Sequence, residues 1–210
     1  MISNKLRQEI FALVEYCKIY EHDIDAFDFG DKVECPDLQS KILDIGIECT
    51  NALPKDKSGQ SGELKMVGVN SKANNIAGLT VFSYWIHSAT DPHMLLDCVR
   101  DKTKKLNGHY KLFGTNALFM HVSSLFSGSQ HFSIRNAEEF ATELDRASIC
   151  GKVKFNPIVL SQLETPNSTL CFAVDTSDCS ITEHHVSLSL SKNEGNKIKE
   201  FFELQTGDSN

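Results

Sequence analysis

Two acidic residues stand at a spacing that lets a single hairpin bring their carboxylates side by side. Glu48 interrupts an apolar run, and Asp37 precedes it by eleven residues in a turn that Pro36 opens. A carboxylate within an apolar strand is costly unless it is paired or binds a cation, and two adjacent carboxylates suit a hard divalent cation such as Mg²⁺. The stretch 36–50 therefore predicts a metal site. The alternatives are that Asp37 is an ordinary turn residue after proline and that Glu48 forms a surface salt bridge.

A β-strand over residues 42–50 must position Glu48. Alternate residues share one face of a strand, so one face here is apolar and the other carries acidic and small residues. The apolar face consists of Ile45, Ile47 and Cys49, and the opposite face of Asp44, Gly46, Glu48 and Thr50. We therefore expect the strand to bury its apolar face and to present Glu48 on the opposite one.

A helix is predicted over residues 91–106, and it carries one lysine on its apolar stripe. The stripe consists of Leu95, Val99 and Leu106, and Lys102 lies on it at helical spacing. A lysine there either extends its ammonium group to the edge of the core or meets a carboxylate. If the helix packs across the strand that bears Glu48, Lys102 would point into the same pocket. There it would stabilise negative charge on a phosphate and orient an attacking water.

The stretch 36–50 resembles the PD-(D/E)XK nuclease superfamily, which includes many restriction and repair endonucleases. Pro36-Asp37 followed by Gly46-Ile47-Glu48-Cys49-Thr50 is similar to bacterial variants that read Pro-Asp…Gly-Ile-Glu-Val-Thr. The motif covers about fifteen residues, and looser agreement extends over residues 1–125. The resemblance implies a restriction-endonuclease-like α/β fold, in which helices flank a mixed central sheet. It also implies an endonuclease that uses Mg²⁺ or Mn²⁺ to hydrolyse phosphodiester bonds of nucleic acid, with DNA as the expected substrate.

The resemblance assigns roles residue by residue. Asp37, Glu48 and the carbonyl of Cys49 match the metal ligands, and Glu9 on the first helix matches an additional ligand found in some members; the alternative for Glu9 is a position at the border of a solvated helix face. Thr50 stands where the superfamily lysine is expected. Some members move that lysine to a neighbouring helix, which makes Lys102 its counterpart. The departure at Thr50 leaves a second possibility, a catalytically inactive nuclease-fold protein that binds a protein or a ligand.

The order of predicted elements indicates an α/β sandwich with a mixed central sheet. One domain over residues 1–210 accommodates them, with a loop or hairpin insertion at 54–90 that would be the contact surface of an inactive relative. Periodicity predicts helices over 3–20, 91–106, 136–146 and 192–202, and strands over 42–50, 117–122, 155–163, 170–174 and 186–190.

The charge of the chain limits how it would contact nucleic acid. Its formal net charge is −7, whereas a basic surface supplies most non-specific affinity for DNA. Any nucleic-acid contact must therefore rest on a local basic surface, on metal bridging or on a partner. Lys104, Lys105 and Lys111 form a small basic cluster that suits a phosphate backbone, although cations at a helix end also complement the helix dipole. A homodimer and a partner from a bacterial defence system remain open.

Other function classes find less support. No run approaches the roughly 18 apolar residues of a membrane span, and the first residues lack the features of a signal peptide. The seven cysteines have no Cys-x-x-Cys spacing and indicate reduced cysteines in a cytoplasmic protein. His184 and His185 would point to opposite faces of a strand, which disfavours a shared metal ion. Cys35 is a weak candidate nucleophile, and the motifs of serine hydrolases and phosphate-binding loops are absent from the sequence.

Overall fold

The computed structural model describes residues 4–30, 35–52, 75–76, 79–80, 91–106, 110–124, 132–147, 152–165 and 167–206. Its helices are α1 (Asn4–Ile19), α2 (Pro92–Lys105), α3 (Ile134–Arg146) and α4 (Lys192–Thr206), with a short 3₁₀ turn, η1 (Ile24–Ala26). Its strands are β1 (Asp28–Phe29), β2 (Leu38–Ser40), β3 (Ile45–Asn51), β4 (Asn75–Ile76), β5 (Leu79–Thr80), β6 (Thr115–Ser124), β7 (Ile158–Thr165), β8 (Ser168–Val174) and β9 (Ile181–Ser187).

Seven of these strands form one mixed sheet. Their spatial order is β1-β2-β3-β6-β7-β8-β9. The pairs β3–β6 and β6–β7 are parallel, with α2 and α3 lying in the connections between them, and the other neighbouring pairs are antiparallel. The predicted α/β class, the mixed sheet and the order of helices and strands are confirmed.

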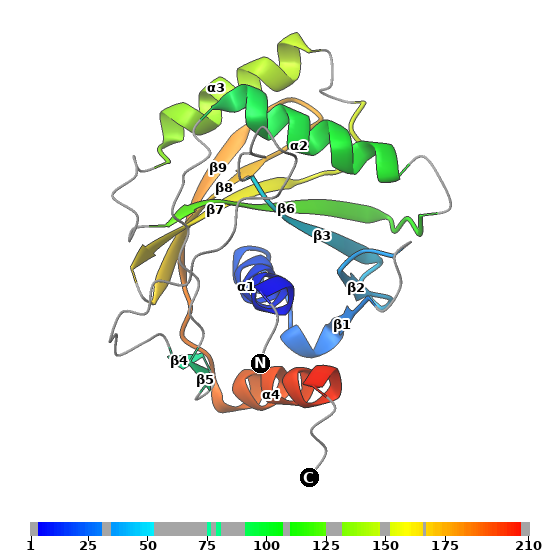
Figure 1. The fold of residues 1–210 in the computed structure, drawn as a ribbon, viewed down its shortest axis with the longest axis vertical. Helices are drawn as coiled ribbons and strands as arrows, with labels where there is room; N and C mark the ends of the chain where they lie inside the picture. Colours follow the sequence, from blue (N-terminus) through cyan, green and yellow to red (C-terminus); the bar gives the residue numbers. More distant parts are fainter. Residues whose placement is uncertain are drawn as a thin grey trace.

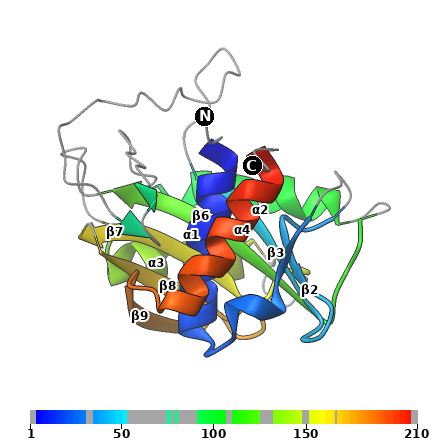
Figure 2. The same cartoon turned by 90° about the horizontal axis from the view of Figure 1, so that it is seen from below.

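Helices cover both faces of the sheet (Figure 1). α2 and α3 lie on one face, and α1 lies on the other with α4 beyond it; Figure 2 shows α4 in front of α1 from that side. β6 illustrates why the sheet needs two helical layers. Ala117 and Phe119 belong to the core beneath α1, whereas Leu118 and Met120 belong to the core beneath α2 and α3. A strand with apolar residues on both faces is stable only when both faces are covered.

Local capping explains where the two crossover helices begin. In α2, the Asp91 side chain accepts a hydrogen bond from the backbone N–H of His93 at 2.9 Å, and Pro92 takes a first-turn position that needs no N–H donor. In α3, Ser133 and Asn136 form a capping box. This box starts α3 at Ile134, two residues before the predicted helix.

The predicted strand over 42–50 is correct in its second part and wrong at its start. β3 begins at Ile45, and residues 41–44 form the exposed turn between β2 and β3. Asp44 has a φ of 55°, a left-handed conformation that aspartate tolerates better than most side chains. Asp44 therefore belongs to the turn and does not share the strand face of Glu48. The last strand is also displaced from its predicted range of 186–190, since β9 spans Ile181–Ser187.

The cysteines in the described part of the chain follow the sequence prediction, except Cys179. Five described cysteines form no disulfide bond, namely Cys17, Cys35, Cys49, Cys98 and Cys171. Cys179 is disulfide-bonded, so the prediction of reduced cysteines is wrong for this residue. The absence of Cys-x-x-Cys spacing gives no information about cysteines that are distant in the chain and that the fold brings together.

The structure tests the predicted insertion and the predicted division into one domain only in part. Of the insertion predicted at 54–90, the structure describes the paired strands β4 and β5, and the remainder lies outside the described residues. The division into one domain stays a prediction. None of the helices in the described part of the chain is both long and apolar enough to span a membrane.

Candidate functional site

The β2–β3 hairpin places Asp37 beside Glu48. The antiparallel register pairs Leu38 with Ile47, and one step further along the same register brings Asp37 opposite Glu48. Oδ2 of Asp37 accepts a hydrogen bond from the backbone N–H of Cys49 at 2.8 Å. This bond ties the residue before β2 to the strand that carries the second carboxylate. The side chains of Asp37 and Glu48 are only 10% and 6% exposed.

Gly46 allows the Pro36–Asp37 segment to lie against β3. A Cβ atom at this position would stand 2.6 Å from Cγ of Pro36 and 2.7 Å from the ring of Phe113. Either distance is far shorter than a normal carbon–carbon contact. Gly46 therefore makes room for Pro36, which precedes Asp37. This packing links the Pro36–Asp37 segment to the strand that carries Glu48.

The carboxylate of Glu48 is surrounded by three donors from α2 and the segment that follows it. Lys102 Nζ lies 2.5 Å from Oε1 and 3.3 Å from the carbonyl oxygen of Cys49, and Lys105 Nζ lies 3.3 Å from the same Oε1. The Tyr110 hydroxyl donates to Oε2 at 2.6 Å. Burial alone would raise the pKa of Glu48, but Lys102, Tyr110 and Lys105 outweigh it and hold the pKa below its ordinary value. Glu48 is therefore ionised at neutral pH.

A second ionic group joins α1 to Asp37. Lys5 Nζ lies 3.0 Å from Oδ1 of Asp37 and 3.3 Å from Oε1 of Glu9. Burial and the neighbouring charge of Asp37 raise the pKa of Glu9, Lys5 lowers it, and the net result is a pKa of about 7. α1 thus contributes Glu9, whose carboxyl group is close enough to Asp37 for the two to interact electrostatically.

The donor atoms match the chemistry of a hard divalent cation. Glu9, Asp37, Glu48 and the Cys49 carbonyl supply oxygen ligands, which Mg²⁺ prefers. Within the described ranges, no three acidic, cysteine or histidine side chains are arranged as a metal-binding group. The carboxylates are instead bound by ammonium groups, and the Lys5 ammonium lies between Glu9 and Asp37, where a shared cation would bind. The oxygen atoms of these residues therefore suit a divalent ion. In this structure the carboxylates contact lysine ammonium groups.

The three lysines predicted to contact nucleic acid have different surroundings. Lys104 pairs with Asp101 at 2.9 Å on the exposed side of α2. Lys105 turns towards Glu48. Lys111 donates to Oε1 of Gln39 at 3.0 Å, and its ammonium lies 4.4 Å from the centre of the Phe113 ring.

Two site residues were absent from the sequence prediction. Lys5 lies four residues before Glu9, a spacing that places both on the same helix face, so the pair had a local signal. Tyr110 had none, because it lies 62 residues from Glu48 in the chain and only the fold brings the two together.

The histidine pair on β9 behaves as predicted for a strand. His185 is exposed and lies 3.3 Å from Glu164 and 3.2 Å from Glu183, and carboxylates raise its pKa. The adjacent His184 is partly buried, and burial lowers its pKa. The opposite environments agree with side chains on opposite faces of the strand.

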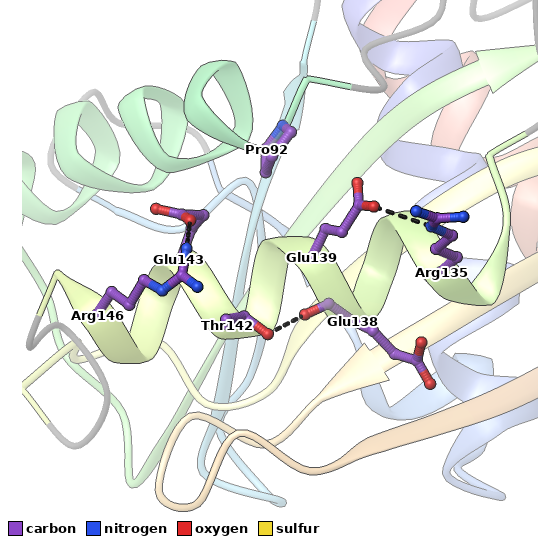
Figure 3. A pocket seen from close by; sticks show the side chains of 7 residues that line it. All are labelled: Pro92, Arg135, Glu138, Glu139, Thr142, Glu143 and Arg146. Carbon is purple, nitrogen blue, oxygen red and sulfur yellow. Dashed lines mark hydrogen bonds and ion pairs between the residues drawn. The ribbon is translucent and has the colours of Figure 1, made fainter.

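A separate pocket of about 410 Å³ lies between the start of α2 and the outer side of α3 (Figure 3). It is lined by Pro92, Arg135, Glu138, Glu139, Thr142, Glu143 and Arg146. Both arginines pair with glutamates of the same helix, Arg135 with Glu139 and Arg146 with Glu143. The pocket shares no residue with the cluster around Asp37 and Glu48, and both of its arginines are paired within α3.

Comparison with known proteins returned no matching family model, no matching curated protein and no matching solved structure.

Proposed function

We propose that this chain is a magnesium-dependent nuclease-like protein that hydrolyses phosphodiester bonds of nucleic acid, with DNA as the substrate. The observation that carries the proposal is the contact of Lys102 with both Glu48 and the Cys49 carbonyl. Thr50 lacks the amine that the resemblance requires, and a lysine from α2 instead reaches the two residues that precede Thr50 in β3. A core-facing lysine that meets a catalytic-type carboxylate is the arrangement expected when the lysine has moved to a helix.

The proposed ligands are Asp37, Glu48 and the Cys49 carbonyl, with Glu9 as an additional ligand. A bound Mg²⁺ or Mn²⁺ would polarise the phosphate and lower the pKa of a bound water. Lys102 would stabilise the negative charge that develops on the phosphate, since its side chain is only 17% exposed and water screens it little. The Tyr110 hydroxyl holds Oε2 of Glu48 and fixes the orientation of the carboxylate.

The surroundings of the site support the same proposal. A mixed sheet with helices on both faces is compatible with a restriction-endonuclease-like fold. Lys104 and Lys105 are 75% and 54% exposed on the last turn of α2, and together with Lys111 they would contact the phosphate backbone. Because the whole chain is acidic, this local cluster must provide the electrostatic attraction. We further propose a cytoplasmic location and action as a homodimer or with a partner from a defence system.

The test is hydrolysis of plasmid and single-stranded DNA by the purified protein with Mg²⁺ or Mn²⁺. Cleavage by the wild type should be lost in the Asp37→Ala/Glu48→Ala double variant and reduced by orders of magnitude in Lys102→Gln. Glu183→Ala, an exposed acidic residue of β9, is the matched control and should cleave like the wild type. Cleavage that persists in the double variant would refute the assignment of the site.

The runner-up is a catalytically inactive nuclease-fold protein that binds a protein or a ligand. One observation favours it: both oxygens of Glu48 already have partners, Lys102 and Lys105 on one and Tyr110 on the other. Such a network is also what a purely structural ion cluster would look like. Calorimetric titration with Mn²⁺ separates the two functions, because the nuclease should bind the ion through Asp37 and Glu48 and the inactive relative should not.

A further inference from the structure

Lys5 occupies a position that helix energetics alone disfavour. It stands in the first turn of α1, where the helix dipole repels a cation. Its partner Glu9 follows it by four residues, and this order of lysine before glutamate is the weaker of the two possible orders. The contact that compensates is tertiary, since Lys5 Nζ lies 3.0 Å from Oδ1 of Asp37. The contact with Asp37, and not the helix itself, therefore accounts for a lysine at this position.

Ammonium groups already contact every carboxyl group of the site. Its carboxyl groups are those of Glu9, Asp37 and Glu48, and the ammonium groups that contact them are those of Lys5, Lys102 and Lys105. Three carboxyl groups thus face three ammonium groups. A divalent cation that enters this cluster would add two positive charges to a poorly solvated place, and release of an ammonium group would offset one of them.

Lys5 is the ammonium group best placed to leave. Its side chain is 72% exposed, against 17% for Lys102 and 54% for Lys105. A flexible lysine side chain of that exposure regains water and rotamer freedom when it is released. Lys102, in contrast, is held between Glu48 and the Cys49 carbonyl.

We propose that Lys5 is a built-in counter-cation that holds Glu9 and Asp37 together in the metal-free protein and is displaced when a divalent cation binds. This inference rests on the proposed function, since it concerns the same metal centre. Lys5 then sets the metal concentration at which the site loads. Removing the charge at position 5 lowers that concentration. A side chain at position 5 that binds the two carboxylates more strongly than lysine raises it.

The experiment is calorimetric titration of the full chain with Mn²⁺. Lys5→Met should bind Mn²⁺ about tenfold more tightly than the wild type, because a competing charge next to both carboxylates is gone. Lys18→Met is the matched control: it lies on the same helix, pairs with Glu194 and changes the net charge equally. Its Mn²⁺ affinity should equal that of the wild type.

A second variant tests the displacement in the opposite direction. Lys5→Arg keeps the charge and offers a guanidinium that can engage carboxylates through two hydrogen bonds. Lys5→Arg should weaken Mn²⁺ binding severalfold. It replaces Lys5→Met as the test variant if circular dichroism shows that Lys5→Met is not folded.

The outcomes separate the inference from the proposed function. If the wild type binds Mn²⁺ and Lys5→Met binds it equally or less tightly, the displacement is refuted and the metal centre stands. A rise in affinity in Lys18→Met equal to that in Lys5→Met would also refute it, because net charge alone would then explain the effect. If neither the wild type nor Lys5→Met binds Mn²⁺, the metal centre and the inference fall together.

Discussion

At the scale of single residues, Glu15 is the most heavily buried carboxylate in the described part of the protein. It is fully buried on α1; Oε1 accepts a hydrogen bond from Ser161 at 2.9 Å, and Oε2 has no partner among the described atoms. Burial raises the pKa of Glu15 to about 7, although Thr169 and Ser161 act in the opposite direction. An acid with a raised pKa is stable in the fold when it is protonated.

The sign of the resulting pH dependence follows from proton binding. Between the ordinary glutamate value and about 7, the folded state keeps a proton on Glu15 that the unfolded chain has released. The free energy of unfolding should therefore fall as the pH rises through this window, by ~3 kcal/mol in total from this group. Glu15→Gln removes the titration, so urea unfolding at pH 5, 6, 7 and 8 should show a shallower decline. Parallel curves for the two proteins would contradict the prediction.

Tyr110 gives a second prediction at this scale. Its buried hydroxyl donates to Oε2 of the ionised Glu48 at 2.6 Å. Tyr110→Phe should lower the free energy of unfolding by ~2 kcal/mol, since a hydrogen bond to a charged group is lost inside the protein. The pKa of Glu48 should rise, because one group that lowers it disappears. Chemical denaturation and nuclear magnetic resonance titration measure the two effects. Tyr20→Phe is the control, and an equal rise in the Glu48 pKa there would argue against a specific contact.

At the scale of elements, the β2–β3 hairpin and α2 carry the site. The alternation of Ile45, Ile47 and Cys49 correctly predicted β3, and the apolar stripe of α2 correctly placed Lys102 on a core-facing side, because both patterns are local and repeat with the period of the element. The turn at Asp44 was missed since a turn depends on the backbone conformation of one or two residues.

The hairpin also yields a prediction. Gly46→Ala would push a methyl group into the side chains of Pro36 and Phe113. We expect the midpoint of urea unfolding to fall by the equivalent of about 1–3 kcal/mol, and Mn²⁺ affinity to fall with it because the Asp37 segment is displaced. Gly114→Ala is the matched control, since its added methyl group meets mainly the end of the flexible Asp44 side chain. If Gly46→Ala leaves both properties unchanged, the packing role of this glycine is wrong.

At the scale of the whole molecule, the site is an assembly of segments that are distant in the chain. α1 contributes Lys5 and Glu9, the hairpin contributes Asp37 and Glu48, and α2 and the segment after it contribute Lys102 and Tyr110. Sequence patterns predicted the members that carry a motif or lie on a stripe. They missed the contacts of Lys5 with Asp37 and of Tyr110 with Glu48, because no local period connects residues that only the packing of helices on the sheet brings together.

If the site binds a metal ion as proposed, the binding is a property of the folded state alone. The unfolded chain keeps Glu9, Asp37 and Glu48 far apart, so an ion that binds the site should stabilise the fold by mass action. With Mn²⁺ at one hundred times its dissociation constant, the melting temperature should rise by roughly 5–10 °C for a chain of this size. The Asp37→Ala/Glu48→Ala variant should show no rise. The Glu164→Ala/Glu183→Ala variant, which removes the carboxylates beside the exposed His185, should rise like the wild type. If the rise disappears in that variant and persists without Asp37 and Glu48, the ion binds at β9, and the proposed metal centre is wrong.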